Sequence, residues 1–592
     1  MANQRLNDLR NYMKQEKVDI CLIYSTDDHN CEYISDHFKY RDYLSGFTGS
    51  AATMAVTSDE AFLWTDGRYF LQAAMELENS DITLQKSGEK NIPTPEEFVA
   101  DYLKDGAVLG IDARVVSANT GKTLAETARE KNAFIKTDFY YSEHVWEGRP
   151  QKPANPVFIL DEKYAGKSAV EKINDLKKEL HLSENDAYIL SSIDNIAWLL
   201  NLRGSDIHYN PVFYSYFYMD QEESALFINK NQLSDEVCRY LSGLQVNIED
   251  YEDIFHYFTK IYAKIYCDEN HSNYAIYSYI KEKGEVVSIN DPVTAFKAVK
   301  NETEIQNIRY CNELDGAAVV RFIKWIREEV KHQEINEFEA SLAIDRFRAE
   351  NESFIEPSFE TICGYKENGA IVHYSAPEEG SKALEPDGAL LVDSGGQYPF
   401  GTTDITRTFS LGEISEKFKT DFTLVLKGVL NLQNGVFTEG CMGLNLDIIA
   451  REPLWQYYKD YNHGTGHGIG YCLNVHESPV NINKRLPVGG CVMKPGMIVS
   501  DEPGLYIENE YGIRTENMLL CKKLSENEFG TFLGFEPLTY APIDLNCIKP
   551  ELLSAQEKEY LNSYHKLVFE KLSPHLNKEE KEWLKDNTKA IS

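Results

Sequence analysis

The spacing of apolar residues along the chain predicts a protein of mixed helices and strands. An apolar residue at every third or fourth position is typical of a helix with one buried face. This spacing predicts helices over residues 4–16, 169–180, 302–327, 337–349, 421–434, 555–572 and 578–585. Short apolar or β-branched runs, which are typical of strands, occur at residues 19–24, 53–56, 186–191, 389–392 and 405–409. We therefore expect an α/β (α+β) fold.

Breaks in this pattern predict three domains. The proline-rich segment 150–156 is the clearest linker, and a second boundary falls near residues 291–300. Between them, a helix pattern followed by a strand pattern repeats the order found at the start of the chain, which indicates a diverged repeat. The predicted domains are residues 1–153, 154–300 and 301–592, and the last includes a C-terminal extension from about residue 538 to residue 592.

Composition excludes several classes of partner. The 592-residue chain has a net charge of −34, which opposes binding to nucleic acid or anionic membranes and favours cations. Its eleven cysteines are scattered without a Cys-x-x-Cys pair, as expected for reduced thiols. The polar N-terminus is unlike a signal peptide, and no apolar run approaches the length of a membrane span. We expect a cytoplasmic protein that binds neither nucleic acid nor membranes.

Two acidic residues stand on either side of a glycine-containing turn in the last third of the chain. Asp393 ends one strand-like run and Asp404 precedes the next, with Gly395 and Gly396 between them. This is the pattern of a hairpin with a long loop, so we expect the two carboxylates to lie roughly opposite each other on antiparallel strands. Like charges in that position repel and are costly to bury unpaired, so a cation should lie between them.

Later blocks supply three more candidate ligands. His467 lies in the glycine-rich run 463–470, and Glu502 and Glu516 flank a second predicted hairpin. The spacing of the glycines is not that of a phosphate-binding loop, so we reject nucleotide binding. Four carboxylates and one imidazole, without sulfur, favour Mn²⁺, Co²⁺ or Zn²⁺ in a two-metal hydrolytic site over a structural zinc site. The alternative is a set of unrelated surface acids, which their ordered placement between apolar strands disfavours.

These residues resemble a known family. Their order, Asp393, Asp404, His467, Glu502 and Glu516, is similar to the metal-binding pattern of the pita-bread metallopeptidases. The segments Gly-Ala-Ile-Val-His373-Tyr, Gly-Thr-Thr-Asp404-Ile-Thr-Arg-Thr, His463-Gly-Thr-Gly-His467-Gly-Ile-Gly, Asn-Val-His476-Glu and Ser-Asp-Glu502-Pro-Gly resemble the aminopeptidase P (Xaa-Pro aminopeptidase) family, most of all its long cytosolic form. The resemblance implies two creatinase-like N-terminal domains and a pita-bread catalytic domain, with a C-terminal segment that serves dimerisation.

The resemblance also implies an activity and a role for each ligand. The enzyme would remove the N-terminal residue from peptides with proline at position two, as a homodimer. Asp404 and Glu516 would bridge two divalent ions, most readily Mn²⁺, with Co²⁺ or Zn²⁺ as alternatives. Asp393 would bind one ion, and His467 and Glu502 the other. A hydroxide bridging the ions would be the nucleophile, because metal coordination lowers the pKa of water, and Glu502 would accept its proton.

Five further residues have places in the resemblance. His373 and His476 would contact the scissile carbonyl and the proline residue, and steady the oxyanion or relay protons. His463 would line the proline pocket; for each of these histidines a purely structural role is the alternative. Arg514 would organise the metal carboxylates, unless it forms a surface ion pair. Arg68, in the first domain, would hold the substrate beyond the proline, although its turn could equally be structural.

Two other functions share part of this pattern. Prolidase, an Xaa-Pro dipeptidase, shares every ligand but is shorter and usually lacks the second N-terminal domain. Some pita-bread domains have lost their metals and act as non-catalytic peptide-binding modules, whereas this chain keeps all five ligand positions. Leu505 and the pair Tyr471-Cys472 depart from the family pattern near the site. They bear on the preference for the N-terminal residue and leave the reaction type unchanged.

Overall fold

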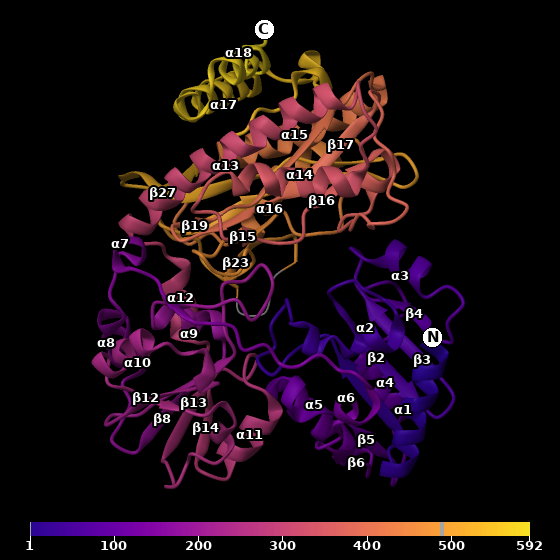
Figure 1. Cartoon of the computed structure of the whole chain (residues 1–592), viewed down its shortest axis with the longest axis vertical. Helices are drawn as coiled ribbons and strands as arrows, with labels where there is room; N and C mark the ends of the chain where they lie inside the picture. Colours follow the sequence, from indigo (N-terminus) through magenta and orange to yellow (C-terminus); the bar gives the residue numbers. More distant parts are fainter. Residues whose placement is uncertain (1, 486–489) are drawn as a thin grey trace. The chain divides into compact units, whose positions relative to one another are not determined.

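The computed structural model describes residues 2–485 and 490–592, which form two compact units. Unit 1 comprises Met1–Leu160 and Lys167–Val293, and unit 2 comprises Asp161–Gly166 and Thr294–Ser592 (Figure 1). Among the described residues, no helix combines the length and the hydropathy that a bilayer span requires. The predicted ligands all belong to unit 2.

Unit 1 contains two six-stranded sheets with the same strand order. The first runs β4 (Thr83–Lys86), β3 (Ala61–Thr65), β2 (Ala52–Thr57), β1 (Ile20–Tyr24), β5 (Val108–Gly110), β6 (Phe134–Lys136). The second runs β12 (Val246–Glu249), β11 (Ser224–Ile228), β10 (Ser215–Met219), β8 (Asp186–Leu190), β13 (Lys264–Cys267), β14 (Glu285–Ser288). In each, the first strand in sequence is antiparallel to the strand on one side and parallel to the strand on its other side. This shared topology confirms the predicted internal repeat.

Helix starts in unit 1 follow from capping residues. The helix α8 (Ala169–Leu180) begins where the Ser168 side chain accepts from the Glu171 amide and the Glu171 side chain accepts from the Ser168 amide. Such a capping box satisfies two amides that a helix end leaves unpaired. The helix α1 (Ala2–Glu16) buries Leu6, Leu9 and Met13 on one face, as their spacing predicts.

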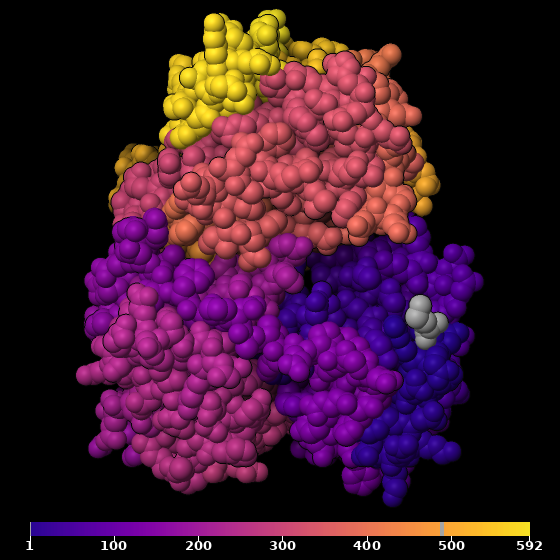
Figure 2. Space-filling view, viewed as in Figure 1, coloured from indigo at the N-terminus to yellow at the C-terminus, as the bar shows by residue number. Residues whose placement is uncertain are grey.

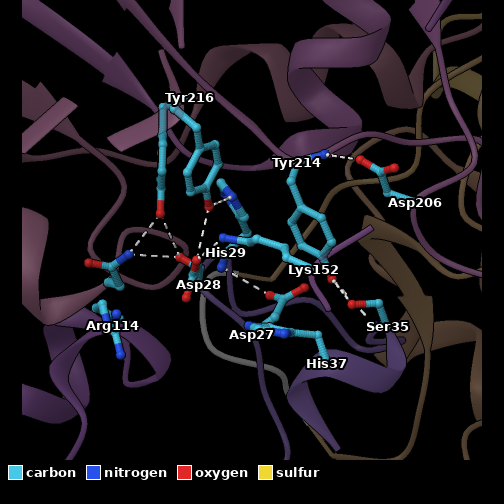
Figure 3. Close-up of polar contacts among 12 residues, drawn as sticks. Asp27, Asp28, His29, Ser35, His37, Arg114, Lys152, Asp206, Tyr214 and Tyr216 are labelled. Atoms are coloured by element: carbon cyan, nitrogen blue, oxygen red, sulfur yellow. Dashed lines mark hydrogen bonds and ion pairs between the residues drawn. The ribbon is translucent and has the colours of Figure 1, made fainter. Parts of the chain in front are cut away.

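A buried polar network joins the two halves of unit 1 (Figure 3). The loop after β1 carries Asp28 and His29, and the Tyr251 hydroxyl lies 3.0 Å from Asp28 Oδ2 and 2.8 Å from His29 Nε2. Lys152, from the proline-rich segment, donates to Asp28 Oδ2, and its Nζ lies 3.9 Å from the centre of the Tyr251 ring. Because buried charges need partners of this kind, the network holds the proline-rich segment in place.

Unit 2 is built mainly from antiparallel strands. One three-stranded sheet places β17 (Ala389–Ser394) between β16 (Ile362–Tyr365) and β20 (Ile405–Ser410). A six-stranded sheet runs β21 (Val436–Thr438), β28 (Gly530–Pro537), β27 (Asn517–Asn527), β24 (Ile498–Asp501), β22 (Gly466–Gly468), β23 (Glu477–Ile482). Shorter ribbons are formed by β25 (Gly504–Ile507) with β26 (Tyr511–Arg514), and by β15 (Glu356–Pro357), β18 (Gly396–Tyr398) and β19 (Gly401–Thr402).

Long helices cover these sheets (Figure 1). Apolar residues of α13 (Glu302–Glu329) and α14 (Glu337–Ala349) form one core with residues of β16, β17 and β20. A second core joins α15 (Glu416–Gln433) to β25, β26 and the C-terminal helix α17 (Ala555–Leu572). The helices α17 and α18 (Lys578–Asn587) form the yellow outer surface of unit 2 in Figure 2. The helix α16 (Gly443–Trp455) packs against α15 and β23, next to the strands that carry the site.

Candidate metal centre

The first two predicted ligands come from the hairpin of β17 and β20. Asp393 lies near the end of β17, and Asp404 immediately precedes β20. The register pairs Asp393 with Thr406, so Asp404 lies two residues beyond the position opposite Asp393. The predicted hairpin is confirmed, but the two carboxylates are offset along the strands and not opposite each other. The reason is that β18 and β19 form a ribbon of their own between them, which sets the length of the connection.

The other ligands lie on three adjacent strands of the six-stranded sheet. His467 is the central residue of β22, which lies between β23 and β24. Glu502 directly follows β24, and Glu516 directly precedes its antiparallel neighbour β27. The register pairs Asp501 with Asn517. Glu502 and Glu516 therefore project from the same end of two paired strands, close to His467.

Three of the ligands are close enough to hold one ion together. One ligand atom each from Asp404, His467 and Glu516 lies within 4.8 Å of the others. His467 Nε2 is 3.3 Å from Asp404 Oδ2 and 3.6 Å from Glu502 Oε1. His467 Nδ1 is 2.9 Å from the Gly468 carbonyl oxygen, to which it donates. This bond directs the Nε2 lone pair toward the carboxylates, as a metal-binding imidazole requires.

Two buried carboxylate oxygens in the site have no hydrogen-bond partner among the described residues. They are Asp393 Oδ1 and Glu516 Oε1. The other oxygen of each carboxylate is held, because Arg514 donates to Asp393 Oδ2 and Thr406 Oγ1 donates to Glu516 Oε2 at 2.8 Å. A buried acceptor without a partner is costly, and a divalent cation would satisfy both. The residues present therefore fit divalent metal ions.

The electrostatics of the site favour the same cations. Burial and repulsion from Asp404 raise the pKa of Glu516 well above its ordinary value, and burial raises the pKa of Asp393 despite its contact with Arg514. Burial also raises the pKa of Glu502 to about 7. These acids oppose one another's ionisation, and two divalent ions would balance four negative charges.

Burial opposes a charge on His467, but its hydrogen bond with Asp404 and the charge of Glu502 raise its pKa to about 9. The imidazole therefore gains a proton in the anionic site, and that proton occupies the nitrogen that a metal ion needs. Metal binding and protonation exclude each other at this residue.

Arg514 lies at the centre of a hydrogen-bonded chain beside the ligands. Its side chain is buried, and it donates to Asp393 Oδ2 from Nε at 3.0 Å and from Nη2 at 2.5 Å. Its Nη1 donates to the Tyr506 hydroxyl at 2.7 Å. That hydroxyl lies 2.8 Å from His463 Nε2, while His463 Nδ1 donates to the Gly464 carbonyl. The Tyr506 proton is therefore directed at His463, and the chain connects Asp393 with the predicted proline pocket.

Tyr506 and Thr406 take part in the site, and the sequence analysis missed both. Thr406 Oγ1 lies 3.3 Å from Arg514 Nε and donates to Glu516. An aromatic residue four positions after Glu502 was the only sign of Tyr506 in the sequence. Thr406 belongs to the Asp404 motif, but nothing local indicates which neighbours its hydroxyl reaches.

The loop that carries His463 and leads into β22 is fixed by α16. Arg451 donates to the carbonyl oxygens of Tyr461 at 2.8 Å and His463 at 2.7 Å. Glycine is needed at the start of β22, because a Cβ at Gly466 would lie 1.9 Å from the Ser500 carbonyl oxygen of β24. The close approach of β22 and β24 thus brings His467 beside Glu502.

Of the remaining predicted residues, His476 and His373 belong to unit 2 and Arg68 belongs to unit 1. The His476 ring lies 4.3 Å from the His467 ring, centre to centre and edge to face, so His476 is brought to the site. His373 follows Val372, whose carbonyl oxygen accepts from Arg514 Nη2 at 3.4 Å. Arg68 belongs to unit 1, where its guanidinium donates to both oxygens of Asp66 at 2.9 and 2.8 Å. The role of Arg68 at the metal centre stays a prediction.

Known families cover almost the whole chain. Sequence profiles of the creatinase/prolidase N-terminal domain match residues 5–139 and 148–304. The profile of metallopeptidase family M24 matches residues 306–523, and that of the C-terminal region of this peptidase family matches residues 531–591. The two N-terminal matches carry the same domain description, which agrees with the repeated topology of unit 1.

Individual relatives match along most of their length. The probable Xaa-Pro aminopeptidase P of Aspergillus flavus is 38% identical over 100% of this chain and 93% of the relative. That of Sordaria macrospora is 39% identical over 95% of this chain and 94% of the relative. The crystal structure of X-prolyl aminopeptidase from Caenorhabditis elegans, described as a cytosolic enzyme with a di-nuclear active site, has a TM-score of 0.95 at 32% identity and covers 100% of both chains.

Proposed function

Because the chain belongs to the Xaa-Pro aminopeptidase P family of M24 metallopeptidases, and is therefore a metal-dependent aminopeptidase, we propose that it cleaves the first residue from peptides with proline at position two. The fold agrees with this family, since two creatinase-like halves precede an M24 catalytic region. The observation that carries the proposal is the cluster of Asp404, His467 and Glu516 within 4.8 Å, beside two buried carboxylate oxygens without hydrogen-bond partners.

We propose that the site holds two divalent ions, with Mn²⁺ the first candidate and Co²⁺ or Zn²⁺ the alternatives. Asp404 and Glu516 would be shared between the ions, Asp393 would bind one, and His467 and Glu502 the other. The oxygen-rich set with one imidazole supports hard or borderline cations. When bound, the ions would supply a water of lowered pKa and positive charge for the developing oxyanion.

The chain's own residues would move the protons. Glu502, 3.6 Å from His467, would accept the proton of the attacking water. The leaving proline nitrogen belongs to a tertiary amide without an N–H, so it has to be protonated as the bond breaks. His476, which packs against His467, would steady the oxyanion or relay this proton. His373 would have the same role.

The part of the substrate on the C-terminal side of the scissile bond would be recognised by two predicted contacts. His463, oriented by the Tyr506 hydroxyl, would line the pocket for the proline ring. Arg68 would bind the part of the peptide beyond the proline, since a guanidinium suits a main-chain carbonyl or carboxylate. We further propose that the protein works in the cytosol as a homodimer formed through residues 538–592. The negative charge of the chain supports the absence of nucleic acid and membrane partners.

Prolidase-type dipeptidase activity is the second candidate. The full-length match to relatives named Xaa-Pro aminopeptidase P, through both N-terminal repeats, favours the aminopeptidase. Hydrolysis of Ala-Pro-Ala, Ala-Pro and Ala-Ala-Ala by the metal-loaded enzyme separates the candidates. We expect cleavage of Ala-Pro-Ala alone, whereas faster cleavage of Ala-Pro would identify a prolidase. Cleavage of Ala-Ala-Ala as fast as Ala-Pro-Ala would overturn the proposal.

A further inference from the structure

Three charged side chains are buried together at the start of β23. They are Lys297 in α12 (Pro292–Ala298), Lys300 just after it, and Glu477, the first residue of β23, and their exposures are 2%, 1% and 2%. Lys300 Nζ contacts Glu477 Oε2 and donates to the Lys297 carbonyl oxygen at 3.1 Å. Lys297 Nζ lies 3.8 Å from Glu477 Oε1. Each ion loses its hydration here, so the position of one charge fixes the positions of the others.

The main chain of Glu477 lies against the strand of a predicted ligand. Glu477 pairs with Gly468, while His467 pairs with Asn481, so the register between β22 and β23 shifts next to His467. Such an irregularity changes the direction of nearby side chains, and a contact that fixes Glu477 fixes this register. The ion pair of Glu477 is such a contact.

His476, the residue before Glu477, faces the site. Its ring lies 4.3 Å from the His467 ring at an interplanar angle of 74°. His476 lies in the bend that directly precedes β23, so the point at which the chain enters the strand, Glu477, sets the position of His476. The two neighbouring side chains have different partners, since Glu477 contacts Lys300 and His476 contacts His467.

The segment that carries Lys300 is itself fixed to the sheet. The Lys300 amide donates to the Gly496 carbonyl oxygen at 2.9 Å, and Val299 forms a bridge with Met497. Met497 directly precedes β24, the strand that leads to Glu502. Lys300 is thus tied through its main chain to one neighbour of β22 and through its side chain to the other.

We propose that Lys300, through its buried ion pair with Glu477, is a positioning residue that holds His476 against His467. Lys300 does not touch the substrate. It acts on the bond-breaking step through the orientation of His476, so this inference rests on the proposed function of the site. The placement of the His476 ring by Lys300 and Glu477 can be tested without any substrate.

The test is a double-mutant cycle on the metal-loaded enzyme with an Xaa-Pro tripeptide. We expect Lys300→Met to lower kcat by about 10-fold or more, with KM and metal content little changed, as when a group acts only in the transition state. Adding Lys300→Met to His476→Ala should cost little more than His476→Ala alone, because both changes remove the same contribution. The inference would be overturned if Lys300→Met kept the wild-type kcat. It would also be overturned if the fold-loss in kcat of the double variant equalled the product of the fold-losses of the two single variants.

The matched control breaks another buried pair in the same unit. Arg348 donates to both oxygens of Asp315, and the two side chains are 0% and 3% exposed. We expect Arg348→Met to lower the melting temperature while kcat stays at the wild-type value. A general loss of stability that reduced kcat would lower it in both variants, and that outcome would overturn the inference.

Two further variants decide the outcome if Lys300→Met does not fold. Lys300→Arg keeps the positive charge of the pair and should retain more of the wild-type kcat than Glu477→Gln, which removes the negative charge. A crystal structure of the Glu477→Gln enzyme should show the His467 and His476 rings parted; an unchanged arrangement would contradict the inference. A wild-type enzyme that cleaves no Xaa-Pro peptide would refute the proposed function alone, and the ring positions would then decide the positioning role.

Discussion

Arg514 donates two hydrogen bonds to the same carboxylate oxygen of Asp393. Both Nε and Nη2 donate to Asp393 Oδ2, at 3.0 and 2.5 Å, while Oδ1 has no hydrogen-bond partner among the described residues. The Glu516 carboxylate is held in the same way: Thr406 donates to Oε2, and Oε1 has no hydrogen-bond partner among the described residues. A carboxylate held in this way presents its second oxygen to a cation in a fixed direction.

Replacement of Arg514 should therefore weaken metal binding. We expect Arg514→Met to raise the metal dissociation constant by about 10- to 100-fold, the usual effect of losing a group that orients a ligand. Arg514→Lys should not restore it, because an ammonium cannot reproduce the two-pronged contact. Competition with a chelator measures the affinity, with Arg348→Met as a control for the loss of a buried arginine. Wild-type affinity in Arg514→Met would contradict the assigned role.

Metal binding should also depend on pH. In the metal-free chain the pKa of Glu502 is about 7, raised by burial, and that of His467 is about 9, raised by Asp404 and Glu502 against the effect of burial. Both groups hold protons below these values and have to release them to bind a cation. Affinity should therefore rise from pH 6 to pH 9, and binding at pH 7 should release at least one proton.

Calorimetry in buffers of different ionisation enthalpy measures this proton release. A binding enthalpy that does not change with the buffer, or an affinity that falls as the pH rises, would show that protons and metal ions do not compete here.

His476 should matter for the reaction and not for the metal. We expect His476→Ala to lower kcat by about 10²-fold or more, the effect of losing an oxyanion or proton-relay group. Metal content should stay at the wild-type value, because His476 is not among the proposed ligands. Elemental analysis alongside steady-state kinetics provides both readouts. Loss of metal, or an unchanged kcat, would exclude the role proposed for this residue.

Arg68 should contribute to binding of the substrate beyond the proline. We expect Arg68→Ala to raise KM for tripeptides and longer substrates, to affect a short chromogenic substrate much less, and to leave metal content unchanged. Arg114 offers a matched control, because it pairs with Asp112 two residues earlier, as Arg68 does with Asp66. Equal losses on long and short substrates, or the same kinetic effect from Arg114→Ala, would leave Arg68 with a structural role.

Helix positions were predictable where local signals agree. The predicted and observed bounds coincide for α8, α14 and α17, each of which begins with a capping box and continues with regular apolar spacing. The helix α15 begins at Glu416, five residues before its predicted start. Ser415 caps its first turn, and the buried Phe418 lies four positions before Phe422, so the apolar spacing extends into this turn and the predicted start was too late.

Candidate ligands were predictable because each stands in a short motif with its own spacing. The contacts that complete the site were not. Lys300 and Glu477 are 177 positions apart, and no local pattern links them before the sheet brings them together. The Tyr506 hydroxyl likewise joins Arg514 to His463 only through the fold. In unit 1, the proline content around Lys152 predicts a linker. It does not indicate that Lys152 pairs with Asp28, 124 positions earlier in the chain.

Returning metal ions to the metal-free enzyme, while following hydrolysis of Ala-Pro-Ala, tests the two-metal site most directly. The ligand set predicts no activity after chelation, and recovery with Mn²⁺ or Co²⁺ that levels off near two ions per chain. Asp404→Asn should lose metal and activity together, because Asp404 lies 3.3 Å from His467 within the ligand cluster and would be shared by both ions. Full activity in the metal-free enzyme, or recovery complete at one ion per chain, would contradict the two-metal site.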